Sequence, residues 1–328
     1  MRRVTVLFTS SLETPFILED LQLLRRHYDV SHLVTRSFDA PFRIFREMSD
    51  AEVTFSWFAS VYTAVVVCIA GMFGKKSVVV VGGADVARVD DAGYGQWASP
   101  WRALLAGYTL RRAWRVLAVD ESLRLEALRR ADYGGENILV VPTGYDPERW
   151  TPGDGRSSGV LTIAACESVS RLKVKGIPDL VKAARLLPEI PFTIVGIGGD
   201  VLRRSGLDAP ANVRILPFAG REDLLALYRD AAVYCQPSLF EGLANSLCEA
   251  MLCGCIPVAT DAGGSARVVG NTGFVVAPRD PGALATALRK ALGASADLGV
   301  AARSRIVELF PLRRREELLT QLIGAAAI

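Results

Sequence analysis

Residues 240–251, Phe-Glu-Gly-Leu-Ala-Asn-Ser-Leu-Cys-Glu-Ala-Met, decide the fold class of this chain. An apolar run at 231–235 and a turn at 236–238 come before this stretch, and a second apolar run at 255–260 follows it. The order predicts a strand, a tight loop, a helix and a strand, which is the unit of a parallel α/β sheet. Such sheets bind ligands at the loops that follow the carboxyl ends of their strands. We therefore expect binding residues within this stretch.

Two carboxylates, Glu241 and Glu249, lie eight positions apart here. If a helix begins near Leu243, its free backbone N–H groups form an anion site. Eight helical residues span roughly 12 Å, so the two carboxylates are too far apart to share one proton or one metal. They can instead hold two ends of an elongated ligand with a phosphate centre. The alternative is that Glu241 is a charge at a helix terminus and Glu249 a solvated helix residue.

The whole string, continued by Gly254-Cys255-Ile256-Pro257-Val258, resembles the family 4 retaining nucleotide-sugar glycosyltransferases. The resemblance implies the α/β GT-B fold, in which two Rossmann-like domains face each other across an interdomain cleft. It also implies that Glu249 binds the donor ribose and that Glu241 contacts the transferred sugar. Contacts at the helix start would then come from Gly242, Leu243, Ala244 and Asn245.

A second motif, Ser170 to Leu180, resembles the Arg-Leu-(x3)-Lys-Gly loop of that family and contains Arg171 and Lys175. A diphosphate leaving group gains negative charge as the glycosidic bond breaks, and a fixed Arg and Lys can stabilise that charge without a metal. The alternative is two solvated basic residues by a helix start. The helix dipole disfavours cations there, so a nearby anion is the better explanation.

Four further positions follow predicted strands, and their roles are implied by the resemblance. Gly198 lies in a glycine cluster that lines the donor cleft in the family, and Phe218 is a candidate neighbour of the nucleobase. Gly83 and Asp85 follow the Val-rich run 77–81 at a place where related enzymes line the acceptor side of the cleft. Asp85 has an alternative role, in which it caps or braces a loop.

The length of 328 residues suits a chain of two domains. We expect a first domain at 1–150, a linker at 151–159, a donor-binding domain at 160–305 and a C-terminal helix at 306–328 that packs back on the first domain, as in the family. The net charge of +3 argues against a nucleic-acid partner. Six cysteines without a paired CxxC unit, and only two histidines, argue against zinc and disulfides and favour a reducing cytoplasm.

Two segments raise the question of a membrane. The uncharged run 57–74 just reaches spanning length, and we interpret it as a buried crossover helix rather than a membrane span. The region 102–130 is rich in arginine, which indicates either solvated helix faces or a basic surface that meets anionic lipid head groups at the inner face of the membrane.

The sequence thus predicts a retaining glycosyltransferase that uses a UDP-, GDP- or ADP-sugar and needs no metal or other cofactor. The acceptor is a hydroxyl of a glycan, a lipid-linked molecule or a small molecule. Two alternatives stay open. One is an epimerase or phosphorylase-like enzyme on the same fold, and the other is a non-catalytic subunit that binds nucleotide sugar. An epimerase would need no acceptor, and the four charged donor residues argue against a silent subunit.

Overall fold

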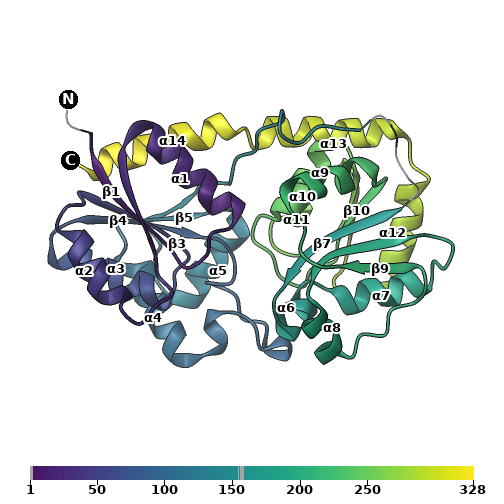
Figure 1. Cartoon of the computed structure of the whole chain (residues 1–328), viewed down its shortest axis with the longest axis horizontal. Coiled ribbons are helices and arrows are strands. Elements are labelled where there is room, and N and C mark those ends of the chain that lie inside the picture. The colour runs from purple at the N-terminus through teal and green to yellow at the C-terminus, as the bar shows by residue number, and fades with distance from the viewer. Residues whose placement is uncertain (1–2, 154, 156–158) are drawn as a thin grey trace. The chain divides into compact units, whose positions relative to one another are not determined.

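The computed structural model describes residues 3–153, 155 and 159–328 of the chain, so part of the predicted linker at 151–159 and the first two residues lie outside the description. The chain forms two compact units, Met1–Gly144 with Leu312–Ile328, called unit 1, and Tyr145–Pro311, called unit 2. The sequence predicts that the first domain ends at residue 150, and the units divide after Gly144. It predicts that the C-terminal segment begins at residue 306, and the chain returns to unit 1 at Leu312. Each unit is an α/β sandwich around one parallel sheet (Figure 1).

Unit 1 contains a six-stranded sheet in the order β2-β1-β3-β4-β5-β6, with every pair of neighbours parallel. Its strands are β1 Thr5–Ser10, β2 Asp29–Val34, β3 Val53–Trp57, β4 Lys76–Val81, β5 Arg115–Ala118 and β6 Ile138–Val140. Its helices are α1 Pro15–His27, α2 Ala40–Met48, α3 Val61–Met72, α4 Pro100–Arg112, α5 Glu121–Ala131 and α14 Leu312–Ala326, with short 3-10 turns η1 Asp90–Ala92 and η2 Gln96–Ala98.

Local sequence explains the element limits in unit 1. Four valines of β4 are fully buried, as expected of a parallel strand covered on both faces. Asp120 caps α5 by accepting a hydrogen bond from the Ser122 N–H at 2.9 Å, and Ser60 caps α3 in the same way. The apolar run 57–74 forms the crossover helix α3, as predicted. Within the described residues, no helix is long and apolar enough to span a bilayer.

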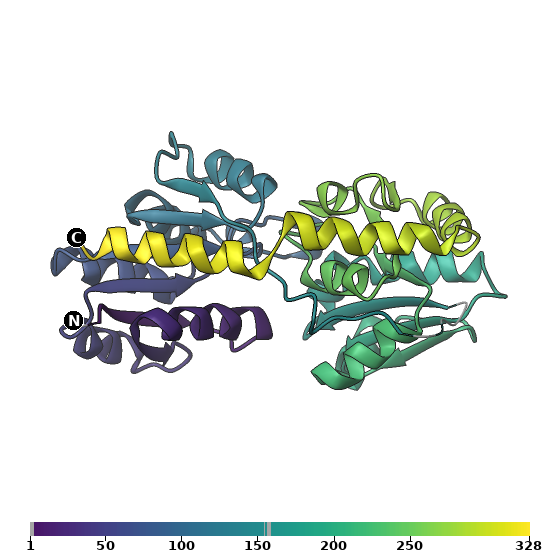
Figure 2. The same ribbon diagram turned by 90° about the horizontal axis from the view of Figure 1, so that it is seen from above.

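The C-terminal helix α14 packs against α1 in unit 1 (Figure 2). A buried ion pair fixes it: the Arg315 guanidinium bonds both oxygens of Asp20, with Nε to Oδ1 at 2.6 Å and Nη2 to Oδ2 at 2.5 Å. Arg315 also donates to the carbonyl groups of Val141 and Pro142, each at 2.8 Å. These bonds hold α14 against α1 and against the segment that follows β6.

Unit 2 contains a second six-stranded parallel sheet in the order β12-β11-β10-β7-β8-β9. Its strands are β7 Val160–Cys166, β8 Phe192–Ile197, β9 Val213–Leu216, β10 Val233–Gln236, β11 Ile256–Thr260 and β12 Phe274–Val276. Its helices are α6 Val169–Val174, α7 Ile177–Arg185, α8 Gly199–Ser205, α9 Arg221–Asp230, α10 Asn245–Leu252, α11 Ser265–Val269, α12 Pro281–Leu292 and α13 Ala296–Leu309.

Two local expectations for unit 2 need correction. The helix of the opening stretch begins at Asn245, two residues after the expected Leu243, because Ala244 still has an extended backbone. The segment around Arg171 is the short helix α6, capped by Ser168, rather than a loop. Arg171 is therefore carried by a helix that begins directly after β7.

Candidate functional site

The order of strands in unit 2 sets one point of the sheet edge apart from the rest. From β7 the chain proceeds to β8 and β9 on one side, and β10, on the other side of β7, leads to β11 and β12. The loops after β7 and β10 therefore diverge, and such a topological switch point leaves a crevice at the carboxyl ends of the strands. Both predicted charged motifs follow these two strands, Arg171 and Lys175 after β7 and Glu241 after β10.

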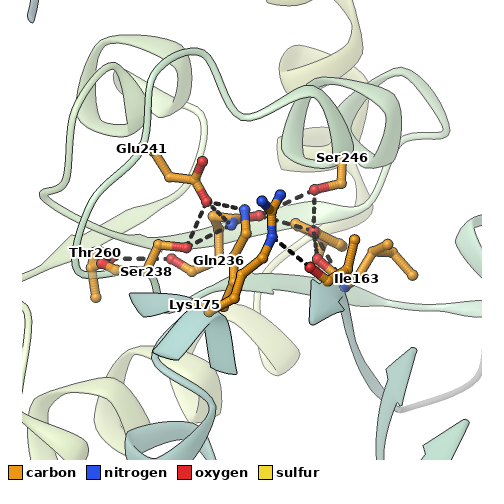
Figure 3. Close-up of polar contacts among 10 residues, drawn as sticks. Ile163, Lys175, Gln236, Ser238, Glu241, Ser246 and Thr260 are labelled. Carbon is orange, nitrogen blue, oxygen red and sulfur yellow. Dashed lines mark hydrogen bonds and ion pairs between the residues drawn. The ribbon is translucent and has the colours of Figure 1, made fainter. Parts of the chain in front are cut away.

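The predicted Glu241 and Lys175 form an ion pair at this switch point. The Lys175 Nζ lies 2.5 Å from Glu241 Oε1, and the two side chains are 11% exposed for Glu241 and 18% for Lys175. The same oxygen accepts hydrogen bonds from Gln236 Nε2 at 2.8 Å and from Ser238 Oγ at 2.7 Å. Figure 3 shows these three donors turned toward one oxygen of Glu241 while the second oxygen points away from them. Glu241 is thus held in one orientation by a charge and two dipoles.

Two glycines allow the backbone approaches that this arrangement needs. Gly176 has a φ of +67°, and a Cβ there would lie 1.8 Å from the carbonyl oxygen of Pro237. Gly263 has a φ of +58°, and a Cβ there would lie 2.0 Å from the carbonyl oxygen of Glu241. A side chain at Gly176 would push apart the segments that carry Lys175 and Glu241, and one at Gly263 would displace the loop after β11 from the Glu241 backbone.

A layer of buried polar groups supports the ion pair, and the sequence did not identify it. The Tyr234 hydroxyl lies 2.9 Å from Gln236 Oε1 and 2.8 Å from Ser246 Oγ. Thr260 Oγ1 donates to the Ser238 carbonyl at 2.5 Å. A polar residue such as Gln236 at the end of a buried strand is the signal that could have found this layer, since buried polar groups need partners. By its sequence alone, Gln236 belongs only to a turn.

Arg171 lies in α6, next to the end of β7. Its Nε donates to the Ala165 carbonyl at 2.7 Å, which fixes the plane of the guanidinium. The pKa of the neighbouring Cys166 thiol is raised to about 11, mainly by burial. The charges of Lys175 and Arg171 lower this pKa, and the charge of Glu241 raises it. The Lys175 N–H donates to the Arg171 carbonyl at 2.9 Å, one helical turn away, and Lys175 pairs with Glu241, so the structure brings the three charged residues together near the end of β7.

Glu249 is not the solvated helix residue of the alternative interpretation. It lies one turn before the end of α10, and its Oε2 accepts a hydrogen bond from the Tyr228 hydroxyl at 3.0 Å. Burial raises the pKa of Glu249 to about 7, while the Tyr228 bond and the more distant Arg221 lower it. Tyr228 is itself fully buried and stands edge-on to Trp150, with ring centroids 5.5 Å apart. The Glu249 side chain is only partly exposed, so its carboxylate is stabilised by a ligand or a proton at neutral pH.

The start of α10 has a partner that the sequence did not suggest. The Tyr145 hydroxyl donates to Asn245 Oδ1 at 2.6 Å, and the Tyr145 N–H donates to the Phe310 carbonyl at 2.9 Å. Tyr145 stands in a Pro-Thr-Gly-Tyr-Asp segment that indicates only a structural turn. Its hydroxyl places Asn245, whereas Gly242, Leu243 and Ala244 are buried in the loop before the helix. Donor contacts from these four residues stay predictions.

Gly198 and Phe218 lie at the same sheet edge. Gly198 precedes α8 directly after β8, the strand beside β7, and Phe218 follows the outermost strand β9 with 54% of its surface exposed. The order of strands therefore ranks them by distance from the switch point, with Gly198 nearer. Their roles toward a sugar cleft and a base stay predictions.

In unit 1 the structure favours the bracing role of Asp85. The residue is only 1% exposed, and its carboxylate accepts bonds from the N–H groups of Gly83 at 2.7 Å and Ala59 at 3.1 Å. Burial raises the pKa of Asp85, and these bonds lower it. Asp85 thus joins the loop after β4 to the segment after β3. Contact of Gly83 or Asp85 with an acceptor stays a prediction.

The arginines of region 102–130 divide into two groups. Those of α5 are paired: Arg124 with Glu121 at 2.6 Å, and Arg129 and Arg130 with Glu126 at 2.7 and 2.8 Å. Those of α4 have no acidic residue in their own helix, which reads Pro-Trp-Arg-Ala-Leu-Leu-Ala-Gly-Tyr-Thr-Leu-Arg-Arg. The positive surface expected over the whole region is therefore confined mainly to α4.

The side chains that commonly ligate metals are dispersed. Within residues 3–153, 155 and 159–328, no group of three or more histidine, cysteine, aspartate or glutamate side chains is arranged to hold an ion.

Comparison with known proteins bears on both units. A family model described as "Glycosyl transferases group 1" matches residues 163–294, which lie wholly within unit 2 and include Arg171, Lys175, Glu241 and Glu249. Over these residues the chain is similar to the group 1 glycosyltransferases. The similarity thus falls on the unit that carries the switch-point ion pair.

Two curated relatives illustrate the similarity. The MMP alpha-(1->4)-mannosyltransferase of Mycolicibacterium hassiacum is 30% identical over 217 residues, 60% of this chain and 50% of the relative. The D-inositol 3-phosphate glycosyltransferase of Geodermatophilus obscurus is 32% identical over 235 residues, 62% of this chain and 51% of the relative. The chain spans about half the length of the curated relatives it matches.

Solved structures extend the likeness in fold to the whole chain. Sucrose-phosphate synthase from Thermosynechococcus elongatus aligns with a TM-score of 0.77 at 16% identity, covering 98% of this chain and 99% of that one. Anabaena Alr3699/HepE in complex with UDP and glucose aligns with the same score and identity, covering 98% and 100%. The α/β fold with two Rossmann-like units is therefore the GT-B fold, as predicted.

Proposed function

We propose that this chain transfers a sugar from a nucleoside-diphosphate sugar to an acceptor hydroxyl, with retention of the anomeric configuration and without a required metal. The observation that carries the proposal is the meeting of Arg171, Lys175 and Glu241 at the switch point of the unit 2 sheet, around the end of β7. Two fixed cations beside one oriented carboxylate suit a ligand with a diphosphate next to a polyhydroxylated ring.

Each charged group has a distinct part in this proposal. Arg171 offers a planar guanidinium whose orientation is set through Nε, and Lys175 offers a compact charge, so together they stabilise the departing diphosphate. Lys175 leaves its bond to Glu241, at least in part, when phosphate oxygens arrive. Glu241 then keeps the bonds from Gln236 and Ser238 and accepts hydrogen bonds from sugar hydroxyls through its second oxygen. Glu249, at the far end of α10, accepts bonds from the ribose diol.

The covalent step needs no protein nucleophile. The bond from the anomeric carbon to the phosphate oxygen breaks with its electron pair going to the diphosphate, and the acceptor oxygen attacks from the same face. The acceptor proton passes to the leaving phosphate oxygen, so atoms and charges balance. The cations at the switch point lower the barrier by stabilising the charge that develops on the diphosphate.

The donor and location are narrower proposals. UDP is supported as the first nucleotide to test because the similar Anabaena structure is a complex with UDP and glucose. GDP- and ADP-sugars remain candidates, with a hexose as the transferred group and a glycan, a lipid-linked molecule or a small molecule as the acceptor. A cytoplasmic enzyme is supported by six cysteines that are thiols rather than disulfides.

The test is sugar-dependent release of nucleoside diphosphate by the purified chain, with UDP-, GDP- and ADP-sugars and a panel of hydroxyl acceptors. Arg171→Ala should lower the rate by about 10²- to 10³-fold, as when one fixed donor to a developing charge is removed. Lys173→Ala is the matched control, because Lys173 is exposed on the same short helix. Equal rates for Arg171→Ala and Lys173→Ala would overturn the assignment of Arg171.

A further inference from the structure

Five large apolar side chains stand exposed on two neighbouring helices of unit 1. Relative exposure is 106% for Phe38, 71% for Phe42 and 52% for Phe45 around α2, and 74% for Met72 and 40% for Phe73 at the end of α3. Helix α3 packs against α2 on the face of the sheet opposite α1 and α14 (Figure 1). We call these five residues the aromatic ridge. Single exposed apolar residues are ordinary, but a contiguous group of this size indicates a binding surface.

Helix α2 has two apolar faces, only one of which the fold uses. Ala40, Ile44 and Met48 recur every four residues and are buried against the unit 1 core. Phe42 and Phe45, three positions apart, line a second stripe on a different side of the helix, and Phe38 stands two residues before the helix begins. The stripe continues onto α3, because the Phe45 and Phe73 rings meet edge-to-face with centroids 5.6 Å apart. Packing within unit 1 therefore buries one stripe and leaves the ridge exposed.

Cations outnumber acidic residues in the segments that adjoin the ridge. Residues 36–50, 72–76 and 100–115, which hold α2, the end of α3 and α4, contain nine lysines and arginines and three aspartates and glutamates, a net charge of +6. The whole chain carries +3, so the remainder is negative. Cations also sit directly on aromatic rings here: Lys75 Nζ lies 5.5 Å from the Phe73 centroid, and the Arg102 guanidinium lies 5.3 Å from that of Trp101, which is 55% exposed.

We propose that this face of unit 1 docks on an anionic lipid bilayer, with the aromatic ridge inserted among the head groups and Lys75 and the arginines of α4 against lipid phosphates. Apolar side chains on one stripe of a helix with cations beside them are what an interfacial helix needs. A second copy of the chain fits less well, because a two-fold contact would place two positively charged surfaces against each other. The arginines of α5 are paired with glutamates, so the positive part of the surface lies at the end of α3 and on α4 rather than over all of 102–130.

The test is flotation of the full chain with vesicles of phosphatidylcholine alone and of phosphatidylcholine mixed with phosphatidylglycerol. The wild type should float with the anionic vesicles and stay behind with the neutral ones, and added salt should weaken binding. The double variant Phe42→Ser with Phe45→Ser should lose about tenfold or more in affinity. It changes only side chains of the outer stripe, so α2 keeps its buried face.

Leu186→Ser is the matched control, since Leu186 is 55% exposed on unit 2 and should have no effect on flotation. Nucleotide binding and donor hydrolysis in solution should be unchanged in the double variant, which separates this proposal from the enzymatic one. Failure of the wild type to float with anionic vesicles would overturn the proposal, as would equal flotation of the double variant. A concentration-dependent dimer that the double variant abolishes, without lipid binding, would assign the ridge to a second copy instead.

Discussion

An ion pair in unit 1 and an ion pair in unit 2 differ in what surrounds them. In unit 1 the Asp20 and Arg315 side chains are 1% and 2% exposed, and their remaining partners are Trp57 Nε1 and the backbone carbonyls of Val141 and Pro142. In unit 2 the Lys175 and Glu241 side chains are 18% and 11% exposed, at the switch point of the sheet. The first pair is enclosed by the protein, whereas the second keeps contact with solvent.

This difference in exposure indicates that one ion pair stabilises the fold and that the other can bind a ligand. A buried pair whose hydrogen bonds are all satisfied by the protein contributes when intact and is costly to break. A partly open pair can exchange its partner for a ligand ion at little cost. We therefore assign the Asp20–Arg315 pair to stability and the Lys175–Glu241 pair to the proposed reaction.

The switch points of the two sheets also differ, since aromatic side chains lie at the switch point of unit 1 and charged side chains at that of unit 2. In unit 1 the switch lies between β1 and β3, and the residue after β3 is Phe58 with a φ of +68°. Its N–H donates to the Val80 carbonyl at 2.8 Å, and its ring lies near those of Trp57 and Phe16. A non-glycine residue held in this conformation points to function. We expect this aromatic cluster to contact the acceptor, whereas the charged switch point of unit 2 binds the donor.

The largest expected effect is on stability. Asp20→Asn should lower the free energy of unfolding by about 3 to 5 kcal/mol, because it leaves the Arg315 charge buried without its counter-ion. Glu316→Gln, which removes the charge of a partly exposed acceptor of Arg26 and His27, should cost at most about 1 kcal/mol. Urea denaturation of both variants measures the contrast. A similar loss of unfolding free energy in the two variants would mean that the Asp20–Arg315 pair does not stabilise the packing of α14 on unit 1.

Next in size is the effect of Lys175→Met on turnover. The variant removes the cation that pairs with Glu241, so transfer should fall by about 10²- to 10³-fold. The melting temperature should change little, since Gln236 and Ser238 still hold Glu241 in a partly open site. Steady-state kinetics beside a thermal melt measures both quantities. A large loss of stability with unchanged turnover in the folded fraction would reverse the assignment of the two ion pairs.

A paired substitution separates the two switch points. Phe58→Ala should raise KM for the acceptor by about tenfold and leave KM for the donor unchanged, because it removes an aromatic contact from unit 1. Phe218→Ala should do the opposite, raising KM for the donor. The measurement is bisubstrate kinetics with each variant. If both substitutions raised KM for the same substrate, the division of donor and acceptor between the units would be wrong.

The smallest expected effect concerns pH. Burial raises the pKa of Glu249 to about 7, so the carboxylate becomes protonated as pH falls through that value and loses an acceptor for ribose. Donor binding should therefore weaken below about pH 7. Tyr228→Phe removes a bond that lowers this pKa, so the acid limb should move to higher pH and binding at pH 7 should fall by about fivefold.

Calorimetric titration with nucleoside diphosphate across pH checks this prediction. Tyr133→Phe is the control, because the Tyr133 hydroxyl bonds the Leu110 carbonyl in unit 1 and should leave the profile unchanged. An identical acid limb in Tyr228→Phe and the wild type would show that this hydroxyl does not act on Glu249.

Much of the fold could be predicted from the sequence because its signals are local. The Val-rich run of β4, the Asp120 cap and the apolar crossover helix each depend on a few adjacent residues, and each lies within a few positions of its predicted place. The charged motifs are likewise visible as short strings. Their meeting at one end of β7 follows from the parallel α/β order together with the resemblance to a known family.

What the sequence could not reveal depends on partners far along the chain. The bond between Tyr145 and Asn245 joins residues 100 positions apart, and the bond between Asp20 and Arg315 joins residues 295 apart. Gln236 and Tyr228 resemble ordinary strand and helix residues until burial forces their polar atoms to find partners. The sequence leaves two roles open for Asp85, because one donor to its carboxylate is the N–H of Ala59. Ala59 follows a different strand and is 26 positions away in the sequence.

The most direct test compares the affinities of a nucleoside and its diphosphate by calorimetry, in the wild type, Arg171→Ala and Lys173→Ala. We predict that the wild type and Lys173→Ala bind UDP, or whichever nucleoside diphosphate is preferred, much more tightly than the nucleoside. In Arg171→Ala that preference should fall by about tenfold or more, with affinity for the nucleoside unchanged. An undiminished preference in Arg171→Ala would contradict the claim that the switch point of unit 2 binds the diphosphate.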